Sequence, residues 1–138
     1  MTSQPSQTVA AAEAELWVSN AVTRLRDRLE GRLSRFPLAI PAAELAESCT
    51  SGKLLRGRAS ILVALAFGSD DREFSVASAC ALELLHTASL LHDDIIDGST
   101  LRRGRPALHV ATDRATAILI ADLLIALAFE FAAPQGEA

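Results

Sequence analysis

The chain has 138 residues, a length that suits one domain. Half of the residues are hydrophobic, 4% are aromatic, and 17 acidic residues against 13 basic ones give a net charge of −4. Scarce aromatic residues with abundant Leu and Ala favour packed helices over a β-rich fold. The lack of a basic excess argues against nucleic acid as a partner.

Residues 1–8 are rich in Ser, Thr, Gln and Pro, and we expect a disordered tail there. This tail lacks the basic start and apolar core of a signal peptide, so we expect a cytoplasmic protein. One helical domain is expected over residues 9–133, with a frayed end at 134–138. The two cysteines, Cys49 and Cys80, do not have metal-site spacing, and Cys80 is predicted to be a buried thiol.

The first predicted helix runs from about Val9 to near Pro37. Its apolar residues recur at spacings of three and four, which is typical of an amphipathic helix. These residues are Val18, Val22, Leu25, Leu29, Leu33 and Phe36. A short helix from Pro41 to about Ser48 follows, because proline suits a first helical turn. A third helix is predicted from about Lys53 to Phe67.

A long central helix is predicted over residues 72–96, after a turn at 68–71. Its core face is predicted to consist of Phe74, Ala77, Ala81, Leu84, Ala88, Leu91 and Ile95. A polar loop from Gly98 to about Thr112 comes next. We find neither an internal repeat nor a strand pattern in the sequence.

The segment 115–133 is almost continuously apolar and has the length of a membrane span. Asp122 near its centre and Glu130 near its end would make a membrane crossing costly. We therefore expect no stable membrane span here. The segment is predicted to be a helix buried in the core or in an interface with another chain.

Three carboxylates, Asp93, Asp94 and Asp97, stand at the end of the central helix. Asp93 and Asp97 are four residues apart and therefore lie on one face of the helix, with Asp94 beside them. Like charges at this spacing repel, and the helix dipole disfavours acids at a C-terminus. A divalent cation would neutralise them, and such hard oxygen ligands suit Mg²⁺, which also bridges to substrate phosphates.

Basic residues gather at 53–58 and again at 102–105, directly after the acid cluster. Arginine offers a planar, permanently charged set of donors that matches phosphate oxygens. The acids together with Arg102 and Arg103 indicate a metal–diphosphate site, whereas Arg105 is expected to be solvated.

The pattern DDxxD followed by RRGxP, with His86 seven residues upstream of the first aspartate, resembles the first aspartate-rich motif of the trans-isoprenyl diphosphate synthases. The resemblance implies that Asp93 and Asp97 bind Mg²⁺ and the allylic prenyl diphosphate, with Asp94 supporting them. It also assigns Arg102 to the allylic diphosphate and Arg103 to isopentenyl diphosphate.

The stretch SGKLLRG resembles the family motif GGKRLRP. Gly52, Lys53 and Arg56 match it. The resemblance implies that Lys53, Arg56 and His86 bind isopentenyl diphosphate. Three positions depart from the motif, namely Ser51, Leu54 and Gly57. His92 and His109 are expected to orient neighbouring groups, and Asp122 is either a core carboxylate or a supporting residue near the site.

The resemblance implies an all-α fold, a helical bundle corresponding to about half of an isoprenoid-synthase barrel. The second half of that barrel carries a second aspartate-rich motif, and the acids after Asp97 form no such cluster. Three interpretations follow. The chain is one component of a two-chain synthase completed by a complementary or homologous subunit, a regulatory subunit of a full-length synthase, or a truncated fragment.

The resemblance also places residues one turn before the acids along the path of the prenyl tail. Ala88 and Ser89 hold these positions, where family members that stop at fifteen carbons have aromatic residues. Both are small, so we expect products of twenty carbons or longer. The alternative for Ala88 is a close-packed core position.

Overall fold

The computed structural model describes residues 7–69 and 71–133, and side chains from residue 15 onward. Its helices and strands are, in chain order, α1 (Gln7–Leu33), α2 (Ala42–Thr50), α3 (Leu55–Ala66), α4 (Arg72–Ile96), β1 (Leu101–Arg102), β2 (Arg105–Pro106), α5 (Leu108–Ala111) and α6 (Arg114–Ala132). The all-α prediction is confirmed. Of the tail predicted at 1–8, residues 1–6 lie outside the described residues, and residues 7 and 8 begin α1. The tail predicted at 134–138 also lies outside them.

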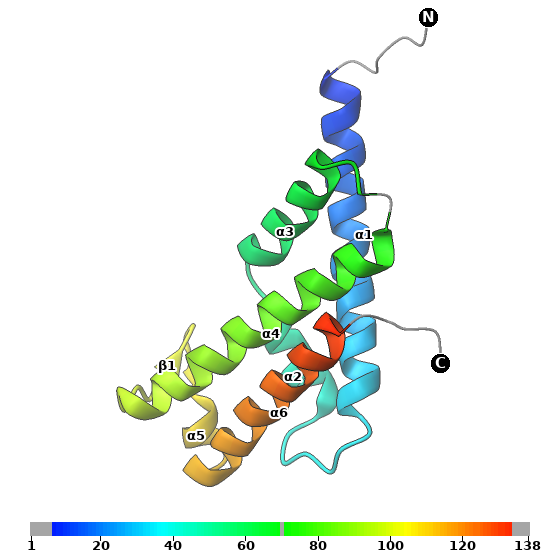
Figure 1. Cartoon of the computed structure of the whole chain (residues 1–138). Coiled ribbons are helices and arrows are strands. Elements are labelled where there is room, and N and C mark those ends of the chain that lie inside the picture. Colours follow the sequence, from blue (N-terminus) through cyan, green and yellow to red (C-terminus); the bar gives the residue numbers. More distant parts are fainter. Residues whose placement is uncertain (1–6, 70, 134–138) are drawn as a thin grey trace, which may run out of the picture.

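The central helix α4 is the element on which the others pack. Figure 1 shows α6 running antiparallel along one side of α4 and α3 beside the N-terminal half of α4. Helix α1 lies behind α4 and α6 in this view. The bounds predicted for α4 are confirmed, and the side chain of Asp71 caps it by accepting from the Phe74 N–H at 2.9 Å. Asp113 caps α6 in the same way, through the Thr116 N–H at 2.9 Å.

Two clusters of buried side chains form the core. The larger cluster joins α1, α2, α4 and α6 through residues such as Leu29, Leu45, Leu84 and Leu124. The smaller cluster joins α1, α3 and the first half of α4, and it includes Cys80, whose predicted burial is confirmed. Burial raises the pKa of both cysteine thiols to about 12.

The structure corrects two predictions, the end of the first helix and one core position. Helix α1 ends at Leu33 rather than near Pro37, so Phe36 lies beyond it and is 42% exposed. Phe74 is 57% exposed, because the buried face at this end of α4 instead passes through Ser75, Val76 and Ala79. Compared with the prediction, α4 is therefore rotated slightly about its own axis where it packs against α1 and α3.

The stretch predicted as a polar loop, from Gly98 to about Thr112, contains a hairpin and the short helix α5. Leu101 pairs with Pro106 and Arg102 pairs with Arg105 in an antiparallel ladder. The two turn residues, Arg103 and Gly104, have φ of 51° and 78°, as a two-residue hairpin turn with the twist of its strands requires. A two-residue strand is too short to show an alternating pattern, so the sequence offered no signal for it.

Two helices, α4 and α6, are long and apolar enough to cross a membrane by length and composition. They pack against each other, and α4 carries the buried carboxylates of Glu83 and Asp94. The core helices of a globular domain have the same length and composition, so these features are weak evidence for membrane spans.

Candidate metal and diphosphate site

The three aspartates of the acid cluster divide into two kinds. Asp93 and Asp97 are exposed and lie one turn apart at the C-terminus of α4, where the Asp97 N–H donates to the Asp93 carbonyl at 2.8 Å. Asp94 is only 2% exposed. The helix therefore presents two carboxylates to solvent and turns the third inward.

Asp94 forms a forked ion pair with Arg102. Arg102 Nε donates to Asp94 Oδ2 at 2.8 Å, and its Nη2 donates to Oδ1 at 2.5 Å. This contact raises the pKa of the Arg102 guanidinium. The hairpin makes the pair possible, because it folds strand β1 back against the end of α4. Asp94 thereby holds Arg102 beside the two exposed acids.

The next arginine, Arg103, points toward a different element. Its Nη1 donates to the Ser51 carbonyl at 3.0 Å and to Ser51 Oγ at 2.8 Å. Its guanidinium also packs on Gly52, where an added Cβ would lie 3.4 Å from Nη1. Arg103 thus ties the hairpin to the α2–α3 loop, and the serine that departs from the family motif accepts its hydrogen bond.

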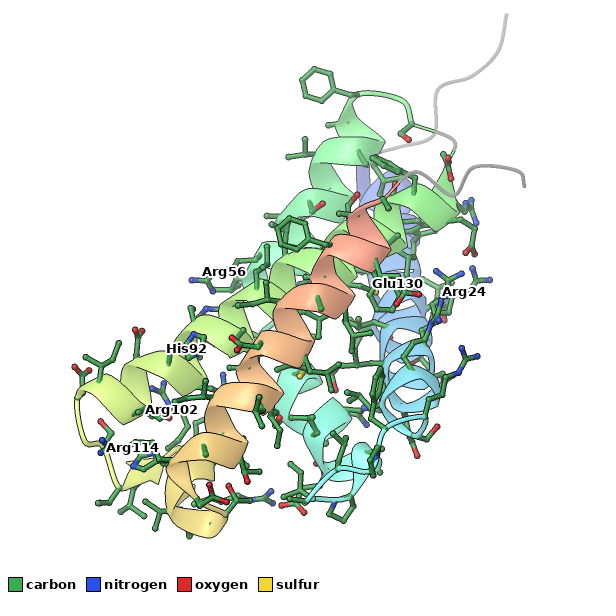
Figure 2. The ribbon with its side chains drawn as sticks, turned by 60° about the horizontal axis from the view of Figure 1, so that its bottom comes forward. Arg24, Arg56, His92, Arg102, Arg114 and Glu130 are labelled. Atoms are coloured by element: carbon green, nitrogen blue, oxygen red, sulfur yellow. The ribbon has the colours of Figure 1, made fainter. Side chains whose placement is uncertain are left out.

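The basic residues near the start of α3 lie along α4, farther back from the acids. Lys53 and Arg56 are exposed, while the Gly57 N–H donates to the buried carboxylate of Glu83 at 2.8 Å. Figure 2 shows Arg102 and His92 toward the C-terminal end of α4 and Arg56 nearer its middle. His86 is half-buried, and its pKa is lowered by burial and by the positive charge of Arg56.

A cavity of about 740 Å³ lies between α2, α4, the hairpin and α5. Polar residues line one part of it, including Glu83, His86, Asp94, Arg102 and Arg103. Apolar residues line the rest, including Ile40, Leu45, Leu90, Leu91 and Leu108. The structure therefore brings four predicted site residues to one cavity and leaves Lys53, Arg56, Asp93 and Asp97 outside its lining.

The remaining predicted residues take varied positions. Asp122 has a side chain that is 60% exposed and lies 3.7 Å from His92 Nε2, so a core position for Asp122 is wrong. Ala88 is buried in the larger core cluster, whereas Ser89 is exposed and donates to the His86 carbonyl at 2.8 Å. His109 Nδ1 is buried and, within the described part of the chain, has no hydrogen-bond partner.

The donor set at the end of α4 fits Mg²⁺. Asp93 and Asp97 offer only carboxylate oxygens, on one face and open to solvent. Among residues 7–69 and 71–133, no group of three His, Cys, Asp or Glu side chains converges on one point. Two carboxylates suit a cation that keeps several waters and takes further oxygens from phosphate.

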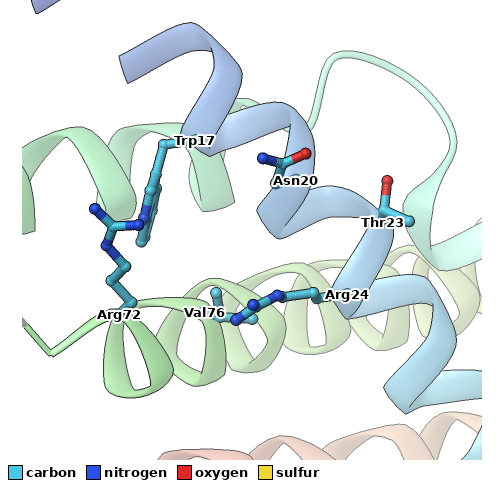
Figure 3. A pocket seen from close by; sticks show the side chains of 6 residues that line it. All are labelled: Trp17, Asn20, Thr23, Arg24, Arg72 and Val76. Atoms are coloured by element: carbon cyan, nitrogen blue, oxygen red, sulfur yellow. The ribbon is translucent and has the colours of Figure 1, made fainter. Parts of the chain in front are cut away.

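A second, smaller hollow of about 290 Å³ lies between α1 and the start of α4. Figure 3 shows Trp17 of α1 beside Arg72 of α4 and Arg24 of α1 beside Val76 of α4, and Asn20 and Thr23 of α1 complete the lining. Arg72 is the first residue of α4 and Asp93 is near its end, so the hollow is roughly 30 Å from the acids along the helix. It is therefore separate from the acid site.

The sequence interpretation missed three features that shape the site, two of which belong to the Glu83–Gly57 contact. These are the capping role of Glu83, the acceptor role of Ser51 and the close approach at Gly57. A lone glutamate on the apolar face of a predicted helix was a usable signal for the first, because such a group needs a partner. The other two were visible only as departures from a motif.

Comparisons with known proteins identify the family of this chain. The sequence model described as Polyprenyl synthetase matches residues 42–136, and the chain therefore belongs to this family. It is 43% identical over 79 residues to an all-trans-nonaprenyl-diphosphate synthase of Rhodobacter capsulatus, covering 57% of this chain and 24% of that one. It is 48% identical over 79 residues to a geranylgeranyl diphosphate synthase of Methanosarcina mazei, with the same coverage of each chain.

Solved structures of related synthases have the same helical arrangement. A polyprenyl synthase of Caulobacter crescentus, complexed with calcium and isoprenyl diphosphate, superposes with a TM-score of 0.70 at 34% identity, covering 95% of this chain and 38% of that one. A heptaprenyl diphosphate synthase of Staphylococcus aureus superposes with a TM-score of 0.71 at 34% identity, covering 83% of this chain and 36% of that one. The chain spans about a quarter of the curated relatives it matches and less than half of these structures.

Proposed function

We propose that this chain is one component of a two-chain trans-prenyl diphosphate synthase, which condenses isopentenyl diphosphate with an allylic diphosphate. One observation carries the proposal: two exposed carboxylates, Asp93 and Asp97, stand beside an arginine that the buried Asp94 holds in place. This is the arrangement that a metal-bound diphosphate requires, with oxygen ligands for the cation and a fixed fork for phosphate oxygens.

Asp93 and Asp97 hold Mg²⁺ in this proposal, and Arg102 binds the allylic diphosphate. When bound, Mg²⁺ stabilises the charge on the pyrophosphate leaving group as the allylic carbon–oxygen bond breaks. Within the described residues, the hydrogen bonds from Arg102 to Asp94 use Nε and Nη2. Its Nη1 group is therefore the donor that reaches a phosphate oxygen, and Asp94 keeps the guanidinium from rotating away.

Isopentenyl diphosphate binds at the start of α3 in this proposal. Lys53, Arg56 and Arg103 supply positive charge to its diphosphate. His86, whose pKa is lowered in the unliganded chain, offers a hydrogen bond to the same group. The hydrogen bonds from Arg103 to Ser51 use Nη1, so its Nε and Nη2 groups are the donors that face phosphate oxygens in this proposal.

The second aspartate-rich motif is proposed to come from a complementary or homologous synthase chain. The described acids after Asp97 are Asp113, Asp122 and Glu130, which lie at different points of α6 and its cap. A regulatory subunit of a full-length synthase and a fragment of a longer chain are the other interpretations. The regulatory subunit predicts a different outcome in the experiment below.

The test is reconstitution. The purified chain is mixed with the C-terminal half of the Caulobacter crescentus polyprenyl synthase, and turnover of isopentenyl and geranyl diphosphate is measured with Mg²⁺. We expect activity from the mixture, little from either part alone, and none with Asp93→Ala. A regulatory subunit would instead leave the mixture inactive and change the rate or product of the full-length enzyme. Robust turnover by this chain alone would contradict the two-chain proposal.

Ala88 is buried in the core cluster, so Ser89 carries the argument on product length. The product is proposed to have twenty carbons or more, because Ser89 is small. Ser89 is exposed on α4 one turn before the acids, so a larger residue there would project into the space that the partner encloses. We expect Ser89→Phe to shorten the product of the active complex, with Ser99→Phe as the control beyond the end of the helix. Chromatography of the dephosphorylated alcohols measures this. Farnesol as the wild-type end product would contradict the assignment.

A further inference from the structure

The first turn of α3 is held by a carboxylate from another helix. The Gly57 N–H donates to Glu83 Oε1 at 2.8 Å, and Glu83 on α4 is only 5% exposed. A Cβ on Gly57 would lie 3.3 Å from Glu83 Cγ and 3.3 Å from Oε1. The contact thus needs a backbone N–H at position 57, and a side chain there would have to displace Glu83 by a few tenths of an ångström.

The contact supplies a cap that α3 lacks locally. The N-terminal N–H groups of a helix have no partner within the helix, and together they carry a partial positive charge. Leu54 at the N-cap has φ of 46° and makes no side-chain capping bond. The same turn carries Arg56 and Arg58, which the dipole disfavours further. Glu83 supplies both an acceptor and a compensating negative charge.

The cap also fixes where the basic residues lie. Lys53 and Arg56 flank the start of α3, and His86 follows Glu83 by three residues on α4, so Glu83 and His86 face the same side of that helix. Glu83 and His86 both line the large cavity. The bond to Gly57 therefore sets the distance between the α3 cations and His86.

We propose that Glu83 is a positioning residue that holds Lys53 and Arg56 in register with His86 for the diphosphate of isopentenyl diphosphate. The proposal rests on the proposed function, in which these three residues bind that group. It also explains the glycine at position 57, where the family motif has proline. Proline has no N–H, so it cannot make this bond.

The experiment measures binding of inorganic pyrophosphate to the full chain by calorimetry, without metal. We expect Glu83→Ala to weaken binding about tenfold, since a hydrogen bond to a charged group is lost, and Glu83→Gln to keep it within about twofold. Charge alone predicts the opposite for the alanine variant, because removing an acid near an anion site strengthens binding. The matched control is Glu44→Ala, which removes a carboxylate that lines the same cavity.

A second measurement follows the cap itself through hydrogen exchange of the Gly57 amide. Glu83→Ala should lose the protection and Glu83→Gln should keep it, and Gly57→Pro should weaken pyrophosphate binding as much as Glu83→Ala does. Wild-type binding in both Glu83 variants would overturn the role of Glu83 and leave the diphosphate site intact. Absence of binding by the wild-type chain at millimolar pyrophosphate would overturn the site itself, even with a protected Gly57 amide.

Discussion

At the scale of single residues, burial separates groups that the sequence motif treats alike. Asp93, Asp94 and Asp97 are three aspartates within five positions, yet one is buried in an ion pair and two are exposed. The motif spacing predicts which carboxylates share a helix face, and it correctly pairs the first with the third. The partner of Asp94 depends on a hairpin that begins seven residues later and could not be read from helix spacing.

The division of the acids predicts effects of different size on the free energy of unfolding. Asp94→Ala removes a buried partner of Arg102, and we expect it to lower the free energy of unfolding by about 1–3 kcal/mol. Asp93→Asn relieves repulsion between exposed acids and should change that free energy by less than about 0.5 kcal/mol. Urea titrations measure both effects. A large loss of stability in Asp93→Asn would contradict the proposed separation of roles.

The lowered pKa of His86 predicts how the stability of the chain changes at acidic pH. Its folded pKa lies below the ordinary value of 6.5, so as pH falls below 6.5 the unfolded chain takes up the proton before the folded chain does. This contribution to stability is therefore complete above pH 6.5 and is lost as pH falls toward the folded pKa. Pyrophosphate should raise the His86 pKa, because a bound anion favours the imidazolium. A histidine NMR titration with and without pyrophosphate measures both, and a pKa above 6.5 in the unliganded chain would contradict this.

At the scale of elements, the helices were predictable and their contacts were not. The range of α4 and the start of α6 near residue 115 follow from strong apolar patterns and from acids that cap both helices. Phe74 was assigned to the core because spacing alone does not say how far a helix is rotated against two neighbours at once. The hairpin was missed because its two strands have only two residues each.

The hairpin turn positions both arginines, so its glycine is a sensitive point. Gly104 has φ of 78°, and an added Cβ would meet nothing within 4 Å. Gly104→Ala should therefore cost about 1–2 kcal/mol through backbone conformation alone. The helical core does not involve the turn, so we expect unchanged helicity together with weaker binding of pyrophosphate. Circular dichroism and calorimetry distinguish these effects, with Gly31→Ala on α1 as the control. Unchanged binding in Gly104→Ala would show that the turn does not place the arginines.

At the scale of the whole molecule, the chain leaves large apolar side chains on its surface. On α6, one face packs on α4 through Ala121 and Leu124, as predicted for a buried segment, but Leu119 and Phe129 are 68% and 70% exposed. Phe67, the C-cap residue that follows α3, is 87% exposed. Related synthases are more than twice as long as the part that superposes on this chain. A complementary chain packing on the outer face of α6 would shield these side chains from water.

Assembly is therefore predicted for the isolated chain or for its mixture with a complementary partner. Burying a side chain such as Leu119 or Phe129 contributes about 1.5–3 kcal/mol each, so a few of them favour association at micromolar concentration. We expect size-exclusion chromatography with light scattering to show a dimer or a heteromer.

Leu119→Glu should weaken that species strongly, because it places a charge in an apolar contact. Leu16→Glu, on an exposed leucine of α1, is the matched control and should leave assembly unchanged. A stable monomer at micromolar concentration, both alone and with the partner, would contradict an interface on α6.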